Sequence, residues 1–595
     1  MRFDIGPETV QTQVERTTAG SPLARWILAV AVFLIPLSFL PTTVDEFVLP
    51  KLLLARLLVM VLAIVLVAGW LRRGAVTWKR TALDLPLVAF IGSAAISSIF
   101  AVNGNVAIFG VYDRWEGLLT ITTYALLFWL AVQLMSGERD ARWMTWSLLS
   151  SGYLIAAVAV LQSALGVLGA GSFGQSGAYF RADATMAHPD FLGIFLAMLL
   201  PIAFAKLISR RPLLTRVLAA NLVIVLSLGL LATFTRSAWI GAVVGIAVVL
   251  ALRGGRFRAL PLIAFAAVLM IGFATLAGIV AARPSSAQGG IANAIYSRIV
   301  SSVDLSSGSI AERLAVWKDT PAIIASRPVL GYGPDNFALV FPLFQTSNRN
   351  SVLFTDPHEE ALGVLATQGV VGFLAYLWIL VAFVRAFWAG RHQRGAVALF
   401  AGWVAYQVSM QVDFSYIPTA VPFWLFAAAA IVTWAPGLKP ARVVAFPPRI
   451  GVPALAAGSL ALAALAIPAV VLPYLADADY YSSQAAPTLP EARATIAQAR
   501  SLAPYEATYA IEAGNDALNQ DANGVPAADA DWAAAREAYE TAARLGSYSP
   551  EMFQNLATVD EHLGDHAAAL AAARRAFSLD PYDPDSLALL TKLGG

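Results

Sequence analysis

Two histidines are the side chains best suited to proton transfer in this chain of 595 residues. His358 lies in the acidic segment Asp356-Pro-His-Glu-Glu360 at the start of an apolar run, and His188 opens another apolar run. A neutral imidazole can accept a proton near pH 7, so both are candidates for general-base catalysis. A lone histidine is more often structural, and that is the alternative for each. The chain has no cysteine, which excludes thiolate catalysis.

Arginines near the ends of other apolar runs are candidates for binding an anion. A guanidinium presents a planar fork of donors that fits phosphate in a bidentate manner, so several together would suit a diphosphate. Pairing with carboxylates close by is the alternative for each of them. The candidates are Arg114, Arg181, Arg236 and Arg313.

Motifs for metals and nucleotides are missing from the sequence. It has no HExxH, no calcium-binding loop, no P-loop and no glycine-rich dinucleotide motif after a strand. The group Asp356, Glu359 and Glu360 is a poor metal site. The sequence therefore predicts no metal and no cofactor.

The elements that carry these residues are predicted to be membrane helices. Hydrophobic residues make up 58% of the chain and charged residues only 13%, which excludes a soluble globular enzyme. A span needs about 20 apolar residues. The fold class is therefore an all-α polytopic membrane protein with 12 or 13 transmembrane helices. The predicted spans lie near 24–40, 50–70, 83–101, 117–136, 146–168, 188–208, 214–233, 237–253, 258–281, 358–384, 395–411, 418–435 and 449–474.

The orientation follows from the basic residues of the loops, which stay on the cytoplasmic side. They cluster in alternate loops, for example Arg72 to Arg80 and Lys206 to Arg216, so the N-terminus is predicted to be cytoplasmic. His188 and His358 then lie at the outer boundary. The candidate arginines are exceptions to this rule, because they lie on the outer face. Either the outer face needs their positive charge, or their side chains simply extend to the membrane surface.

Two segments outside the spans have distinct compositions. The loop 283–357 is predicted to face outward and to be ordered, with a helix over 311–326, because it contains Tyr332, Phe337, Phe341 and Phe344. Residues 477–595 are rich in Ala, Asp and Glu. There, Phe553, Leu556, Ala569, Ala576 and Pro581 have the spacing of a 34-residue helix–turn–helix unit.

This C-terminal segment resembles a short tetratricopeptide-repeat array. After 13 spans it would lie outside the cytoplasm, and it would serve as a surface for a protein partner or as a packing cap. The predicted domains are a cytoplasmic tail (1–23), a transmembrane domain that includes the external loop (24–435), a linker with the final span (436–476) and the repeat-like domain (477–595).

The order of the outer-face motifs resembles the O-antigen ligase superfamily of bacterial envelope proteins. The resemblance covers roughly residues 24–435. The motifs are Arg114-Trp-Glu-Gly117, Arg181 with Ala187-His-Pro-Asp-Phe-Leu-Gly193, Thr235-Arg-Ser-Ala-Trp239, Arg313-Leu-Ala-Val-Trp317, Gly331-Tyr-Gly-Pro-Asp-Asn-Phe337, and Pro357-His358 with Gly369-Val-Val-Gly372.

The resemblance implies a glycosyltransferase that works without metal or nucleotide. It would transfer a glycan from undecaprenyl diphosphate to a hydroxyl acceptor on the outer face of the bacterial inner membrane. Arg236 and Arg313 match the family arginines that hold the diphosphate, and His358 matches the histidine that activates the acceptor. Arg114, Arg181, His188 and Glu359 are the further substrate-binding candidates.

The acceptor stays open, because Glu359 and Gln368 depart from the residues that family members commonly carry. A glycolipid, a glycan and a protein are all compatible with the sequence. A repeat-unit polysaccharide polymerase and a protein O-oligosaccharyltransferase of the same superfamily are alternatives. A lipid or polysaccharide transporter and a non-catalytic scaffold with tetratricopeptide repeats are alternatives of other classes.

Overall fold

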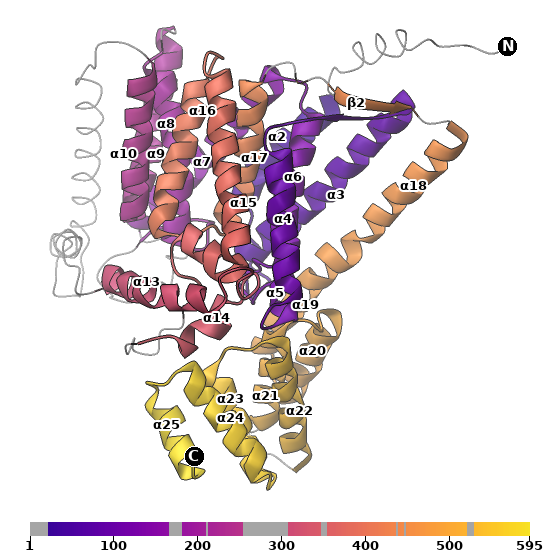
Figure 1. Ribbon diagram of the computed structural model, residues 1–595, viewed down its shortest axis with the longest axis vertical. Coiled ribbons are helices and arrows are strands. Elements are labelled where there is room, and N and C mark those ends of the chain that lie inside the picture. Colours follow the sequence, from indigo (N-terminus) through magenta and orange to yellow (C-terminus); the bar gives the residue numbers. More distant parts are fainter. Residues whose placement is uncertain are drawn as a thin grey trace.

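The computed structural model describes residues 22–165, 181–209, 212–253, 308–346, 354–435, 438, 440–445, 448–519 and 529–595. A bundle of apolar helices forms one part of the molecule, and a smaller domain of short helices lies at one end of the bundle (Figure 1). The predicted tail, the predicted span 258–281 and loop residues 283–307 and 347–353 lie outside the described residues, apart from Pro22 and Leu23.

Apolar helices occur at every predicted span that falls within the described ranges. Seven of them are long and apolar enough to cross a membrane, and five more are shorter. This confirms the predicted class of a polytopic helical membrane protein. The helices are α2 (Pro22–Leu37), α3 (Val48–Arg73), α4 (Asp84–Ile99), α6 (Leu118–Leu134), α7 (Glu138–Leu165), α8 (Pro189–Leu207), α9 (Leu213–Ala232), α10 (Arg236–Leu252), α15 (Glu360–Gly390), α16 (Ala396–Ser409) with η2 (Met410–Val412), α17 (Ile417–Trp434), and α18 (Pro448–Ala464) with η3 (Ile467–Val471).

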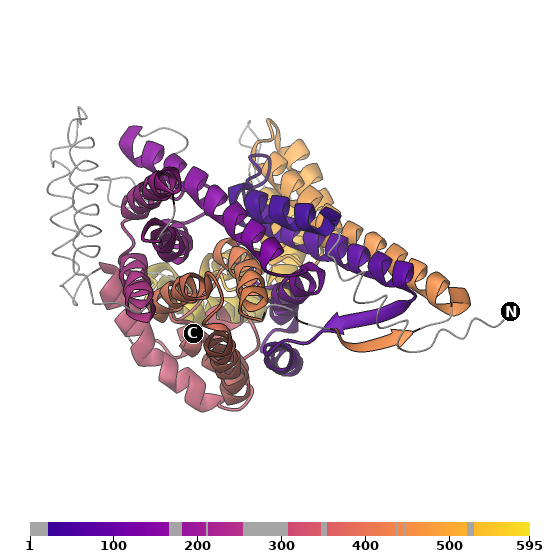
Figure 2. The same cartoon turned by 90° about the horizontal axis from the view of Figure 1, so that it is seen from above.

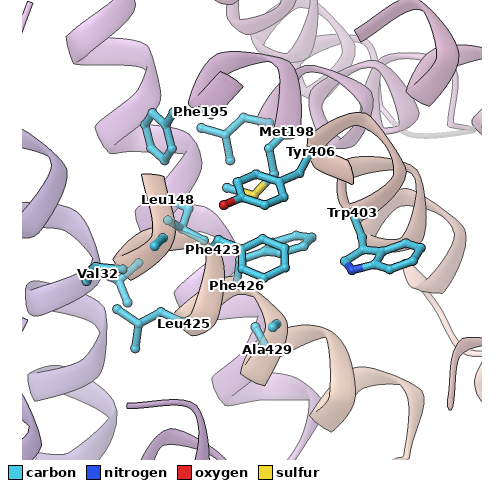
Figure 3. Packing of buried hydrophobic residues seen from close by; sticks show 14 of the residues in the cluster. Val32, Leu148, Phe195, Met198, Trp403, Tyr406, Phe423, Leu425, Phe426 and Ala429 are labelled. Atoms are coloured by element: carbon cyan, nitrogen blue, oxygen red, sulfur yellow. The ribbon is translucent and has the colours of Figure 1, made fainter. Parts of the chain in front are cut away.

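Helices α8 and α17 lie at the centre of the bundle, and nearly all of their residues are buried. Figure 3 shows Phe195 and Met198 of α8 packed near Phe423 of α17 and Tyr406 of α16. The Tyr406 and Phe423 rings stack with centroids 4.1 Å apart. Viewed along the bundle, α18 runs beside α3 at the periphery (Figure 2). The centre of the bundle is thus a packed core that holds the helix ends in place.

Two short strands pair at the end of the bundle opposite the C-terminal domain (Figure 1). β1 (Ala75–Lys79) and β2 (Pro440–Ala445) are antiparallel, with Val76 opposite Val444. The sequence does not predict these strands, because the partners are short and far apart in the chain. The pairing requires that the loops after α3 and α17 lie on one side, as the distribution of basic residues predicts.

The long loop before α15 contains α13 (Gly308–Ser326), α14 (Phe337–Val340) and η1 (Phe341–Leu343). Helix α13 confirms the predicted helix over 311–326. Phe337 and Phe341 are buried, and their rings stack with centroids 5.2 Å apart. The described part of the loop therefore has a small core of its own, as its aromatic residues predict.

A kink in α15 fixes the turn Gly331-Tyr-Gly-Pro334 against the membrane bundle. Gly369 has φ 65°, and a Cβ there would overlap the carbonyl oxygen of Val329, so this position favours glycine. The freed backbone groups bond the turn: Val370 N–H donates to Pro328 O at 2.8 Å, and Gly333 N–H donates to Thr367 O at 2.8 Å. The kink thus anchors the segment that follows α13.

Short helices in consecutive pairs form the C-terminal domain. They are α19 (Leu472–Gln484), α20 (Leu489–Leu502), α21 (Ala507–Leu518), α22 (Asp529–Leu545), α23 (Pro550–His562), α24 (His566–Leu579) and α25 (Pro584–Lys592). Phe553, Leu556, Ala569 and Ala576 share one buried cluster between α23 and α24, which confirms the predicted helix–turn–helix repeat. Helix α19 runs across the predicted boundary at residue 477.

Candidate active site

The N-terminus of α8 places His188 and Asp190 at the end of the bundle that faces the C-terminal domain. His188 caps the helix: its Nδ1 accepts a hydrogen bond from Asp190 N–H at 3.2 Å, and Pro189 occupies the first helical position. Gly193 allows α8 to approach the start of α10, because a Cβ there would lie 2.9 Å from Thr235 Cβ. The motif from Ala187 to Gly193 therefore positions a carboxylate beside an imidazole.

Asp190 joins two of the predicted arginines, which come from separate parts of the chain. Arg181 Nη2 bonds Asp190 Oδ1, and Arg181 Nε donates to Thr233 O at 3.0 Å. Arg313 Nη2, on α13, lies 3.7 Å from Asp190 Oδ2. The Thr235 hydroxyl donates to Asp190 Oδ1 at 2.9 Å. Asp190 is thus the centre of the cluster, although the sequence analysis gave it no role.

His358 lies in a strained turn directly before α15. Its φ is 52°, and its N–H donates to Asp356 Oδ1 at 2.6 Å. Trp317 Nε1 holds the turn by donating to Pro357 O at 2.8 Å. The imidazole Nδ1 lies 3.9 Å from Asp356 Oδ1, and it is buried with no hydrogen-bond partner among the described residues. No hydrogen bond from the described residues therefore fixes the protonation of this nitrogen.

Burial lowers the pKa of His358 below its usual value of 6.5, and it lowers the pKa of His188 in the same way. The charge of His358 lowers the pKa of His188 further, because the two imidazoles lie close enough to interact. Both imidazoles are therefore neutral at pH 7. A neutral imidazole is the form that accepts a proton from a hydroxyl group.

Arg114 reaches the same cluster, but carboxylates surround its guanidinium. Arg114 Nε lies 2.6 Å from Asp335 Oδ1, and Nη1 lies 2.5 Å from Asp356 Oδ2. Its charged end also covers the Phe414 ring at 5.1 Å. Arg114 therefore joins the loop after α13 to the turn that contains His358. Arg114 therefore pairs with carboxylates, which was the alternative to anion binding. Its partners Asp335 and Asp356 are not ones that the sequence indicated.

The remaining two predicted site residues begin helices. Glu359 caps α15, because its carboxylate accepts hydrogen bonds from Leu362 N–H at 2.6 Å and Ala361 N–H at 3.2 Å. Arg236 is the first residue of α10, directly after Thr235, and is half-buried. That Glu359 and Arg236 contact the substrate stays a prediction.

Strained backbone gathers around this cluster. A positive φ is uncommon for residues other than glycine, and such strain concentrates at functional sites. Among the described residues, the non-glycine positions with positive φ all lie in the loops that carry the cluster or flank it. They are Asp113, Trp115, Ala184, Ala187, Phe234, Asp335 and His358.

Comparison with known families gives one match. Residues 220–377 match the family model described as O-Antigen ligase. Residues 220–377 are therefore similar to the O-antigen ligase family. The matched segment includes Arg236, Arg313 and His358, whereas Arg114, Arg181 and His188 precede it.

Comparisons with solved structures and with curated proteins do not extend this family match. A solved structure titled "Crystal structure of APC/C hetero-tetramer Cut9-Hcn1" is similar at 12% identity over 86% of this chain and 81% of that one. Its TM-score of 0.19 is too low to support a conclusion about the fold. Curated proteins gave no match.

A cavity of about 920 Å³, named the polar cavity for its ionisable lining residues, lies between the helix bundle and the C-terminal domain. His188, Asp190, Arg114 and His358 line it on the side of the bundle. Asp413 also lines it. Burial raises the pKa of Asp413, and its Oδ2 has no hydrogen-bond partner within the described ranges. No local sequence signal marks Asp413, which follows an apolar span.

An apolar cavity of about 170 Å³ extends from this site into the helix bundle. Leu87, Phe90, Ile379 and Phe383 are among the residues that line it. Arg114, Thr355 and Phe414 line both cavities. A polar chamber at the helix ends thus borders an apolar one between the helices, the pattern that suits an amphipathic substrate. Among the described residues, no group of three or more histidines or carboxylates is placed to hold a metal ion.

Proposed function

We propose that the protein is a glycosyltransferase that transfers a glycan from undecaprenyl diphosphate to a hydroxyl acceptor on the outer face of the bacterial inner membrane. The observation that carries this proposal is that Arg181 and Arg313 both pair with Asp190, which lines one polar cavity together with His358. The match to an O-antigen ligase family model supports the same class of reaction.

The donor would bind across the border of the two cavities. The apolar cavity between α4, α6, α15 and α17 suits part of the polyprenyl chain. Arg181 and Arg313, both pairing with Asp190, offer bidentate donors to the diphosphate, which carries more negative charge than the single carboxylate. Arg236, next to Thr235, would add a further positive charge.

In the transfer step, His358 acts as the general base. It takes the proton from the acceptor hydroxyl while the hydroxyl oxygen attacks the anomeric carbon of the donor sugar. The bond from that carbon to the diphosphate oxygen breaks, and the arginines stabilise the negative charge that develops on the leaving diphosphate. Asp356, with Oδ1 3.9 Å from His358 Nδ1, stabilises the imidazolium that forms.

The test is release of undecaprenyl diphosphate from a purified donor by the full-length protein in EDTA. His358→Ala is expected to lower acceptor-dependent release by about 100-fold or more. His392→Ala is the matched control, because His392 is exposed in the loop between α15 and α16. Equal release by the wild type and His358→Ala would remove His358 from the mechanism.

The role of the arginines is tested in the same assay. Arg313→Ala is expected to lower release by about 100-fold, since it removes a donor to the developing negative charge. Arg142→Ala is the control, because Arg142 is exposed and pairs only loosely with Glu138 at 3.8 Å. If EDTA abolished the release of lipid diphosphate and added divalent ions restored it, the reaction would not be independent of metal.

A further inference from the structure

We infer that the C-terminal helical domain forms the acceptor-binding wall of the polar cavity, and that the acceptor it binds is an uncharged glycan. This inference rests on the proposed function and names the substrate class for one side of the same site.

The C-terminal domain contributes a continuous wall to the cavity that holds the candidate catalytic residues. The wall consists of the start of α21 and the turn between α22 and α23. His188 and His358 of the helix bundle line the same cavity. A molecule that fills the cavity therefore touches both domains. The wall residues are Tyr505, Glu506, Ala507, Thr508, Ile511, Leu545, Gly546, Ser547, Tyr548 and Ser549.

Direct contacts hold this wall in place against the helix bundle. Asn105, in the short helix α5 (Gly104–Phe109), donates from Nδ2 to Tyr505 O at 2.8 Å and to Leu545 O at 3.0 Å. The Phe109 and Tyr505 rings stack with centroids 4.2 Å apart. Gly546 has φ 99°, and a Cβ there would lie 2.7 Å from a Val106 side-chain carbon. Both segments of the wall thus pack directly on α5.

A buried carboxylate adds a second attachment. Asp477 of α19 accepts hydrogen bonds from the Tyr112 hydroxyl at 2.6 Å, from the Tyr509 hydroxyl at 3.1 Å and from Asp45 N–H at 3.1 Å. Tyr112 is two residues before Arg114, which contacts the turn of His358. The acceptor wall and the catalytic turn are therefore held by one short segment of chain.

The residue types of the wall suit a sugar. Tyr505 and Tyr548 offer ring surfaces to the apolar faces of a sugar, while hydroxyl and carboxyl groups can bond its hydroxyls. Burial raises the pKa of Glu506 to about 7 and that of Asp45 to about 7. Near neutral pH these two carboxyl groups therefore both donate and accept hydrogen bonds.

The charges in the cavity disfavour an anionic acceptor. Within the described residues, the only arginine or lysine that lines the polar cavity is Arg114, which Asp335 and Asp356 already neutralise. An acidic sugar that enters this cavity would lose hydration without gaining a free arginine or lysine partner among the lining residues. The acidic lining residues are Asp45, Glu46, Asp113, Asp190, Asp413 and Glu506.

Binding without a donor tests the inference independently of transfer. The full-length protein in detergent is titrated with neutral malto-oligosaccharides and with oligogalacturonates of equal length, and saturation-transfer NMR reports binding. The neutral sugars are expected to bind, and the acidic ones to bind at least about tenfold more weakly. Tyr548→Ala is expected to weaken neutral-sugar binding about tenfold, while Tyr548→Phe, which keeps the ring, retains most of it.

Two further variants protect the test against a folding defect. Ala507→Arg adds bulk in the cavity at a half-buried position without removing a contact of its own side chain, and it is expected to abolish binding. Tyr582→Ala is the matched control, because Tyr582 is exposed and does not line the cavity. No binding of any neutral sugar, equal binding of the acidic sugars, or unchanged binding by Tyr548→Ala and Ala507→Arg would overturn the inference. Tighter binding of a Ser- and Thr-rich peptide would assign the cavity to a polypeptide and also overturn it.

Kinetics separate this inference from the proposed function. In the transfer assay, Tyr548→Ala is expected to raise the KM for the acceptor about tenfold and to leave the KM for the donor unchanged. Sugar binding by a wild type that transfers no glycan would contradict the proposed function alone. Transfer with an unchanged acceptor KM in Tyr548→Ala would contradict only the role of the C-terminal wall.

Discussion

Arg313 Nη2 lies 3.7 Å from Asp190 Oδ2, which brings α13 next to the N-terminus of α8. Asp190 also binds Arg181 and accepts a hydrogen bond from Thr235, so one carboxylate sets the positions of two guanidinium groups. In the proposed reaction this carboxylate keeps the arginines in place for the diphosphate.

Asp190→Asn is expected to destabilise the protein and to slow glycan transfer. The substitution leaves two largely buried arginines without their shared counter-charge, which costs about 3 kcal/mol. Misplacing the arginines by about 1 Å costs about 100-fold in rate. Thermal unfolding in detergent and release of the lipid diphosphate measure the two effects. Glu138→Gln, at an exposed and loose ion pair, is the control, and equal behaviour of both variants would contradict the central role of Asp190.

The pH dependence of transfer is expected to show an acidic limb below pH 6.5. Burial lowers the pKa of His358, so the active neutral imidazole persists at neutral pH and is lost only as the pH falls through the lowered pKa. Asp356 raises the pKa of His358 through its charge. Asp356→Asn is therefore expected to move the limb to lower pH, as measured from kcat/KM profiles. A limb that moves to higher pH would contradict this assignment.

Gly369→Ala is expected to destabilise the kink in α15 by more than about 2 kcal/mol. The positive φ alone costs about 1 kcal/mol for alanine, and the new Cβ also overlaps the carbonyl of Val329. Gly395→Ala is the matched control, because Gly395 has φ 80° and no atom within 4 Å of its Cβ position. The difference in unfolding temperature between the variants reports the overlap together with the greater backbone strain at Gly369, where ψ is −167° against −6° at Gly395. Equal shifts in the unfolding temperature of the two variants would mean that the turn after α13 moves to make room for the added Cβ.

Tyr112→Phe is expected to weaken the attachment of the C-terminal domain. It removes a hydroxyl donor from the buried Asp477 carboxylate, which costs about 2 kcal/mol. Hydrogen exchange of α20 and α21 would report the loosening. Tyr481→Phe is the control, because the Tyr481 side chain is exposed. Unchanged exchange in Tyr112→Phe would show that the other contacts suffice.

The sidedness of the C-terminal domain can be measured by cysteine labelling, because the chain has no cysteine. Ser482→Cys, at an exposed position of α19, is expected to react with an impermeant maleimide in intact spheroplasts. His392→Cys, at an exposed position of the loop after α15, is expected to react only after permeabilisation. Labelling in the reverse order would contradict the predicted orientation.

Local patterns in the sequence determined most of the fold. Apolar runs of membrane length predict the helices because backbone groups in a lipid bilayer must bond within the segment. The repeat in Phe553, Leu556, Ala569 and Ala576 predicts the helix pair α23 and α24 for a similar reason, since its small and apolar residues recur at helical spacing. The residue types of His358, Arg181 and Arg313 likewise suggested a polar site at the outer helix ends.

Only the tertiary structure decided how these residues meet. Three contacts join segments that are far apart in the chain. Asp190 pairs with both Arg181 and Arg313. Arg114 pairs with Asp335 and Asp356, and β1 pairs with β2. The same holds for the wall of Tyr505 and Tyr548 opposite His358. Such contacts depend on the packing of helix ends, whereas hydropathy and repeat spacing report only the neighbours of a residue along its own helix.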